Sequence, residues 1–134
     1  MKQEKSCGAV LFRGEEKREY LILKSVKGHW SLCKGHVEGD ETEDETARRE
    51  IWEETGLTVD FVEQFRQVIT YSPYPGCTKD VVFFLARVSG GRLTCQPQEV
   101  AEAEFLPYED GLERLTHASD RDTLTKAERF LNGR

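Results

Sequence analysis

The sequence has no apolar run that approaches the ~20 residues needed for a helix to cross a bilayer. Its start, Met1 to Lys5, leads directly into a strand-like segment without the apolar stretch of a targeting signal. These absences predict a cytoplasmic protein that has no membrane partner.

Closely spaced cysteines are also absent. The four cysteines, Cys7, Cys33, Cys77 and Cys95, lie far apart and include no Cys-x-x-Cys pair. Because this spacing gives neither a zinc-ligand pattern nor a disulfide framework, we expect free thiols that mostly serve in packing.

An excess of positive charge is missing as well. The chain has 19 Lys and Arg against 25 Asp and Glu, a formal net charge of −6. Long nucleic acids are bound through basic surfaces, so they are not expected partners. A small anionic substrate would instead need metal ions and a few local cations.

The length of 134 residues suits one domain, residues 1–134, as a monomer or homodimer.

The pattern of apolar residues predicts a mixed α/β fold. Strand-like composition occurs at residues 5–13, 19–26, 57–71, 80–88 and 102–106. Gly90-Gly91 predicts a turn between the fourth of these segments and residues 92–95. Helices are predicted from Thr42 to Gly56 and over residues 119–132, with a short helical turn at 110–116. Such helices would cover the faces of a mixed sheet.

The first predicted helix carries a cluster of carboxylates. Glu50, Glu53 and Glu54 have i, i+3 and i+4 spacing, which places them within an arc of roughly 100°. Ala47 and Ile51 occupy the adjoining arc, so the cluster should border the buried face. Such crowded hard oxygen ligands suit Mg²⁺ or Mn²⁺. The alternative is a solvated helix whose glutamates pair with Lys or Arg.

A longer motif decides between these alternatives. Gly35, five residues, Glu41, seven residues and then the run Arg49-Glu50-Ile51-Trp52-Glu53-Glu54-Thr55-Gly56-Leu57 resembles a complete Nudix box. The resemblance covers nearly the whole chain. It implies an α/β/α sandwich with a mixed β-sheet between helices, and a nucleotide-like substrate whose pyrophosphate bond is hydrolysed with the help of a divalent metal.

The resemblance also implies roles for individual residues. The side chains of Glu50, Glu53 and Glu54 would hold the metals, aided by the main-chain carbonyl of Gly35, and Arg49 would orient a glutamate through an ion pair. Helical spacing alone would pair Arg49 with Glu53 or with Glu45.

Two further glutamates are candidates for the site. Glu41 precedes the helix, where it would either join the metal shell or favour the helix N-terminus. Glu99 resembles a distal metal-binding glutamate of the family, although a loop glutamate can equally be a surface residue. The general base is expected to be Glu50, with Glu99 as the second choice.

Segments outside the box point to a subfamily. Residues 28–39 and 78–86 resemble the corresponding elements of asymmetric diadenosine tetraphosphate hydrolases, which cleave their substrate to ATP and AMP. The analogy implies that His29 and Lys79 contact the polyphosphate and that Lys34 adds a positive charge.

A tyrosine is expected to stack on the adenine, either Tyr71 or Tyr74. The chain departs from this subfamily at Cys33, where proline is usual, and at residues 115–120, which lack an aromatic residue for a second base. A nucleoside triphosphate, an RNA 5′ end or another nucleoside diphosphate derivative therefore stays open as a substrate. So does a non-catalytic nucleotide sensor, although such a module would be expected to lose box carboxylates.

Overall fold

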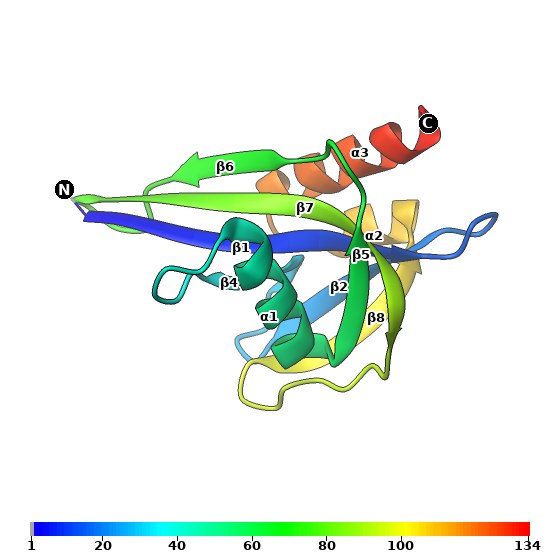
Figure 1. Cartoon of the computed structure of the whole chain (residues 1–134), viewed down its shortest axis with the longest axis horizontal. Coiled ribbons are helices and arrows are strands. Elements are labelled where there is room, and N and C mark those ends of the chain that lie inside the picture. Colours follow the sequence, from blue (N-terminus) through cyan, green and yellow to red (C-terminus); the bar gives the residue numbers. More distant parts are fainter. Residues whose placement is uncertain (1) are drawn as a thin grey trace.

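The computed structural model describes residues 2–134, which form one mixed β-sheet between helices (Figure 1). The strands are β1 (Lys2–Arg13), β2 (Glu19–Ser25), β3 (Trp30–Ser31), β4 (Cys33–His36), β5 (Leu57–Phe61), β6 (Gln67–Tyr71), β7 (Cys77–Gly91) and β8 (Val100–Pro107). The helices are α1 (Glu43–Thr55), α2 (Tyr108–Arg114) and α3 (Ala118–Asn132).

The long strand β1 organises the sheet. It runs parallel to β7 along its whole length, from the Lys2–Cys77 pair to the Phe12–Arg87 pair. On its other side, the middle of β1, Ser6 to Ala9, pairs with β4, whereas its last residues pair with β2. The sheet therefore divides beside β1 into two diverging parts, and β4 lies at the division.

Alternation along β1 creates two cores. Val10 and Phe12 pack into the core that includes Leu124 and other side chains of α3. Leu11 points to the opposite face, into the core that includes Ile51 of α1. Because successive strand residues face opposite sides, one strand holds both helix layers in place. The predicted α/β/α sandwich is confirmed.

The helix α1 begins and ends where the sequence predicts. Thr42 and Glu45 form a capping box, and Gly56 ends the helix in the left-handed conformation at φ 72°. Ala47 and Ile51 are fully buried. The predicted orientation of this helix is therefore confirmed.

The predicted strand over residues 57–71 is wrong in its middle. The segment forms two strands, β5 and β6, that pair with different parts of β7. Between them, Gln64 takes a left-handed φ of 71°, and Phe65 turns into the core on the α3 side. Composition did not reveal this break because Phe65 is as apolar as a strand residue.

The predicted turn at Gly90-Gly91 is also wrong. Both glycines lie in β7 and pair with Thr58 and Leu57 of β5, while residues 92–95 form no strand. Instead, the backbone N–H groups of Thr94 and Gln96 donate to the carbonyls of Thr55 and Glu54, at 2.8 and 3.3 Å. The segment after β7 thus satisfies carbonyls that the end of α1 leaves unpaired.

Two more expectations concern loops and cysteines. The short strands β3 and β4 lie outside the strand-like segments predicted from composition. All four cysteines are free, and Cys7, Cys33 and Cys77 are buried.

Within residues 2–134, the helices are too short or too polar to span a membrane.

Candidate active site

Arg49 lies at the centre of the carboxylates on α1. Its Nη1 donates to Glu50 Oε1 at 2.7 Å and to Glu53 Oε2 at 3.1 Å. Its Nη2 also donates to the carbonyl of His36, at 2.8 Å, which ties the helix to the end of β4. The guanidinium therefore fixes two glutamates of the motif in a set orientation.

Glu41 is the strongest partner of this arginine. Its carboxylate accepts from Nε and Nη2 of Arg49 at 2.7 and 3.0 Å, and from the Thr46 hydroxyl at 2.9 Å. The bond from Arg49 is the main reason why the pKa of Glu41 falls to about 2. Neither of the two roles considered for Glu41 describes this contact: it holds Arg49 in place.

Gly35 is in direct contact with Glu50. A Cβ added at Gly35 would collide with the Glu50 carboxylate, so only glycine lets this side chain approach the backbone of β4. The approach brings a carboxylate and a strand backbone together, as a site for a hard cation requires.

Glu54 lies deeper than its neighbours. Burial, followed by the nearby charge of Glu50, raises the pKa of Glu54 to about 8. The thiol of Cys33 lies 3.7 Å from Glu54 Oε2 and donates to it. Burial also raises the pKa of Cys33, so the thiol stays protonated and serves as a donor. A bound cation would stabilise the ionised form of this buried carboxylate more than that of an exposed one.

Glu99 lies near Glu54, although it belongs to a different segment of the chain. The loop before β8 puts it in a cavity of about 170 Å³ whose lining includes Glu54, Lys34 and Ser31. The charge of Glu99 contributes to the raised pKa of Glu54. The structure thus brings Glu99 and Glu54 together from segments 45 positions apart in the sequence.

These residues fit a divalent cation. Burial raises the pKa of Glu50 as it does that of Glu54, and crowded carboxylates of this kind are stabilised by a bound cation. Across residues 2–134, no group of three or more His, Cys, Asp or Glu side chains already has the arrangement of a metal site. Arg49 donates to Glu50 and Glu53, and the Cys33 thiol donates to Glu54.

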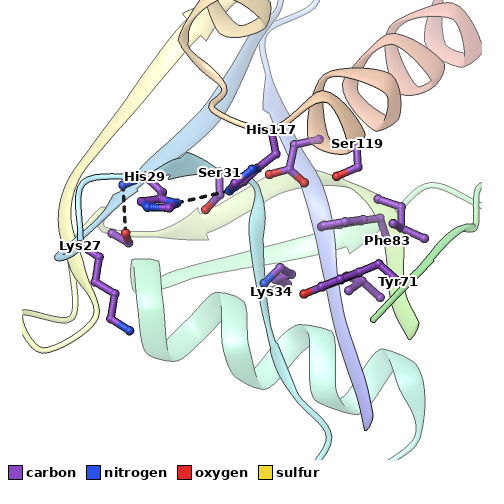
Figure 2. Close-up of a pocket in the computed structure, with 12 residues that line it drawn as sticks. Lys27, His29, Ser31, Lys34, Tyr71, Phe83, His117 and Ser119 are labelled. Atoms are coloured by element: carbon purple, nitrogen blue, oxygen red, sulfur yellow. Dashed lines mark hydrogen bonds between the residues drawn. The ribbon is translucent and has the colours of Figure 1, made fainter. Parts of the chain in front are cut away.

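A larger cavity of about 410 Å³ opens on the α3 side of the sheet (Figure 2). His29, Lys34 and Tyr71, three residues expected at the substrate, line it. In Figure 2 the Tyr71 hydroxyl points toward Lys34. Phe83 adds an aromatic wall, so the cavity combines an apolar body with a few polar groups, as ligand sites commonly do.

The other two expected substrate residues lie elsewhere. Tyr74 is outside the lining, and its hydroxyl donates to Glu4 Oε2 at 3.1 Å. Lys79 is 8% exposed and lies next to Tyr71 across the β6–β7 ladder, beside the cavity without lining it. Of the two tyrosines, the structure thus brings only Tyr71 to the cavity.

Two titratable residues of this cavity, His117 and Asp120, are not among the residues expected from the sequence. Nε2 of His117 lies 3.3 Å from Nδ1 of His29, and the two rings are 5.4 Å apart at their centroids (Figure 2). Asp120 is 5% exposed, and burial raises the pKa of its carboxyl group. No motif marks either residue, because α3 brings them to the cavity from far along the chain.

Comparisons with known proteins identify the family of the chain. The NUDIX domain family model matches residues 2–127. The asymmetrical bis(5'-nucleosyl)-tetraphosphatase of Mus musculus is 29% identical over 140 residues, which cover 95% of this chain and 95% of that protein. The 8-oxo-(d)GTP phosphatase of Mycolicibacterium smegmatis is 37% identical over 133 residues, but the chain spans only 40% of its length.

Solved structures show the same relationship. The structure of a C. elegans Ap4A hydrolase binary complex superposes with a TM-score of 0.88 and 28% sequence identity, covering 98% of this chain and 99% of that one. The chain therefore belongs to the Nudix family, and it is a Nudix pyrophosphohydrolase.

Proposed function

We propose that the protein cleaves diadenosine tetraphosphate asymmetrically, to ATP and AMP. One observation carries this proposal: the cavity beside Tyr71 and the cavity beside Glu54 and Glu99 share Ser25, Ser31 and Lys34 in their linings. A nucleoside in the larger cavity would have its phosphates directed over Lys34 to the carboxylates. The similarity to the mouse and C. elegans enzymes over nearly their full lengths supports the same substrate.

A divalent cation, Mg²⁺ or Mn²⁺, would be held by Glu50, Glu53, Glu54 and Glu99 together with the carbonyl of Gly35. When bound, it would neutralise phosphate oxygens and lower the pKa of the attacking water. The remaining steps depend on side chains of the protein, and the first is removal of a proton from the attacking water.

Glu50 is the proposed general base. Arg49 holds one of its oxygens, Oε1, and burial raises the pKa of the carboxyl group toward the range in which a base operates well. Glu99 is the second candidate, because it lines the same cavity as Glu54 from a separate loop. Asymmetric cleavage then requires that the nucleotide be bound firmly on one side of the carboxylates.

The substrate would be oriented by cations and one aromatic ring. Lys34 lies between the two cavities, and His29 and Lys79 would contact the outer phosphates. Tyr71 would stack on the adenine, because its ring lies at the cavity while that of Tyr74 does not.

The test is a product assay with Mg²⁺ on diadenosine tetraphosphate. We expect ATP and AMP in equal amounts, and a loss of activity of about 100-fold or more in Glu53→Gln and Glu54→Gln. Glu63→Gln, an exposed glutamate away from the site, is the matched control and should keep normal activity. Two ADP as products would contradict asymmetric cleavage, and normal turnover in both variants would contradict the metal site.

A nucleoside triphosphate is the second candidate substrate. In the larger cavity, Tyr71 can stack on one base. His117 belongs to residues 115–120, the segment that lacks an aromatic residue for a second base. One base and one phosphate chain fit that arrangement. The same assay with ATP and deoxynucleoside triphosphates decides, since a higher kcat/KM for any of these would favour this candidate.

A further inference from the structure

A buried carboxylate lines the larger cavity. Asp120, in the first turn of α3, is 5% exposed, and no other Asp or Glu of residues 2–134 is as little exposed. It belongs to the lining of the larger cavity but not to that of the smaller cavity at Glu54 and Glu99. The proposed metal site therefore does not use this carboxylate, and its place in a ligand cavity calls for an explanation.

Asp120 forms no ion pair within residues 2–134. The neighbouring Arg121 donates instead to the carbonyl of Leu115, at 2.7 Å. Burial raises the pKa of Asp120, whereas the charge of Lys34 and the backbone N–H of Leu32 favour its ionised form. An ionised carboxylate accepts hydrogen bonds through both of its oxygens, so one backbone N–H leaves room for donors from a ligand.

The carboxylate lies close to the ring that is proposed to stack on the base. Burial raises the pKa of the Tyr71 hydroxyl, and the charge of Asp120 is the next cause. Both residues line the same cavity, Tyr71 from the end of β6 and Asp120 from α3. A base stacked on Tyr71 would therefore bring its edge within reach of the carboxylate.

The charge of Asp120 decides which part of a nucleotide can lie beside it. A phosphate group would be repelled by the carboxylate, whereas the edge of a nucleobase carries N–H donors. Lys34, which the two cavities share, attracts the phosphates toward Glu54 and Glu99. The two charges thus orient a nucleotide with its base at Asp120 and its phosphates at Lys34.

We propose that Asp120 selects the base of the bound nucleotide and favours guanine over adenine. The N1–H and the amino group at C2 of guanine lie side by side, so together they can donate to the two oxygens of one carboxylate. Adenine has one amino group beside the ring nitrogen N1, whose lone pair would face a carboxylate oxygen. A buried acceptor that meets no donor is penalised, which separates two bases of similar shape.

The selection deepens the proposed function and rests on it, because it requires a nucleotide in the larger cavity. It extends the substrate class from diadenosine tetraphosphate to dinucleoside tetraphosphates that contain guanine. In wild-type protein, kcat/KM should be about tenfold higher for diguanosine tetraphosphate than for diadenosine tetraphosphate.

The decisive experiment measures binding of GMP, IMP and AMP to the full chain by calorimetry with Mg²⁺. These ligands have no pyrophosphate bond to hydrolyse. IMP keeps the N1–H of guanine but lacks the amino group at C2, so it offers one of the two donors. We expect GMP to bind about tenfold more tightly than AMP, with IMP between them. Equal affinities for the three nucleotides, or no binding of GMP, would overturn the selection.

Asp120→Asn tests the carboxylate itself. The amide oxygen can still accept from Leu32, but the second oxygen is replaced by a donor. An asparagine pairs well with adenine through one donor and one acceptor, so AMP should now bind at least threefold more tightly than GMP. Asp122→Asn, at an exposed position of α3 that pairs with Lys126, is the matched control and should keep the wild-type ratio within about twofold.

A structural role would give a different result. If Asp120 only supported the fold, Asp120→Asn would weaken GMP and AMP binding equally and leave their ratio unchanged, which would overturn the selection. If this variant failed to fold, the order of GMP, IMP and AMP in wild-type protein would still decide.

The base selection and the reaction can fail separately. If dinucleoside tetraphosphates were not hydrolysed while GMP bound more tightly than AMP, the proposed reaction would fail and the selection by Asp120 would stand. If diadenosine tetraphosphate gave ATP and AMP while GMP and AMP bound equally, the reaction would stand and the selection would fail.

Discussion

At the scale of single residues, close approaches decide the geometry of the site. Gly35 admits the Glu50 carboxylate to the backbone of β4, and Glu41 holds Arg49 with two hydrogen bonds. Each of these residues acts on the glutamates through shape or through another residue. Small substitutions at these positions should therefore affect activity more than stability.

Gly35→Ala tests the close approach. The added Cβ would force the Glu50 carboxylate away from β4, and we expect kcat/KM to fall about 10- to 100-fold while Tm changes little. Steady-state kinetics and thermal unfolding measure the two effects. Gly133→Ala at the end of α3, far from the carboxylates, is the control. Equal activity in wild type and Gly35→Ala would show that Glu50 does not need this position.

Glu41→Gln tests the hold on Arg49. The amide keeps the size of the side chain but removes the charge that pairs with the guanidinium, which then loses its set orientation. We expect kcat to fall about tenfold, with a smaller change in KM, because the substrate does not contact Glu41. If Glu41 were a metal ligand instead, the Mg²⁺ concentration for half-maximal activity would rise and excess Mg²⁺ would restore the rate.

At the scale of elements, local signals in the sequence were reliable for α1 and poor for β5 and β6. The capping box at Thr42 and the glycine at 56 act within one turn, so the sequence alone places both helix ends. The break after Phe61 depends on Phe65 entering a core built by distant strands, which no local pattern contains.

The same distinction holds for the site. The motif between Gly35 and Gly56 predicts the carboxylates because one helix carries three of them. His117 and Asp120 reach the cavity only through the packing of α3 on the sheet, and Glu99 meets Glu54 because residues 92–96 bind the end of α1. Local sequence patterns do not predict such contacts between distant segments.

The N-terminal cap of α1 is the element-scale prediction. Thr42→Ala removes the hydroxyl that accepts from the Glu45 backbone N–H and should lower the free energy of unfolding by about 1 kcal/mol. Thr42→Ser keeps a hydroxyl and should stay close to wild type. Urea unfolding measures both variants, and equal stability of the alanine and serine variants would contradict the role of the cap.

At the scale of the whole molecule, ion pairs join segments that the sheet does not connect. Glu43 at the start of α1 accepts from Arg66 in the loop before β6 at 2.9 and 2.8 Å, and it pairs with Lys5 of β1 at 2.6 Å. These contacts, the bond from Arg66 first among them, lower the pKa of Glu43 from 4.5 to about 2. The ion pairs between these three segments therefore form only while Glu43 is ionised.

Acid should remove this link over a defined range of pH. Because folding lowers the pKa of Glu43, its contribution to stability is complete above about pH 4.5 and disappears as the pH falls toward 2. Arg66 is 51% exposed, so solvent limits the contribution to about 1 kcal/mol or less, and Arg66→Gln should lower Tm by roughly 2–4 °C at pH 7. Arg129→Gln, at an exposed position of α3, is the control. The difference in Tm between wild type and Arg66→Gln should shrink steadily below pH 4.5, and a difference that stays constant down to pH 3 would show that Arg66 stabilises the fold through packing instead of charge.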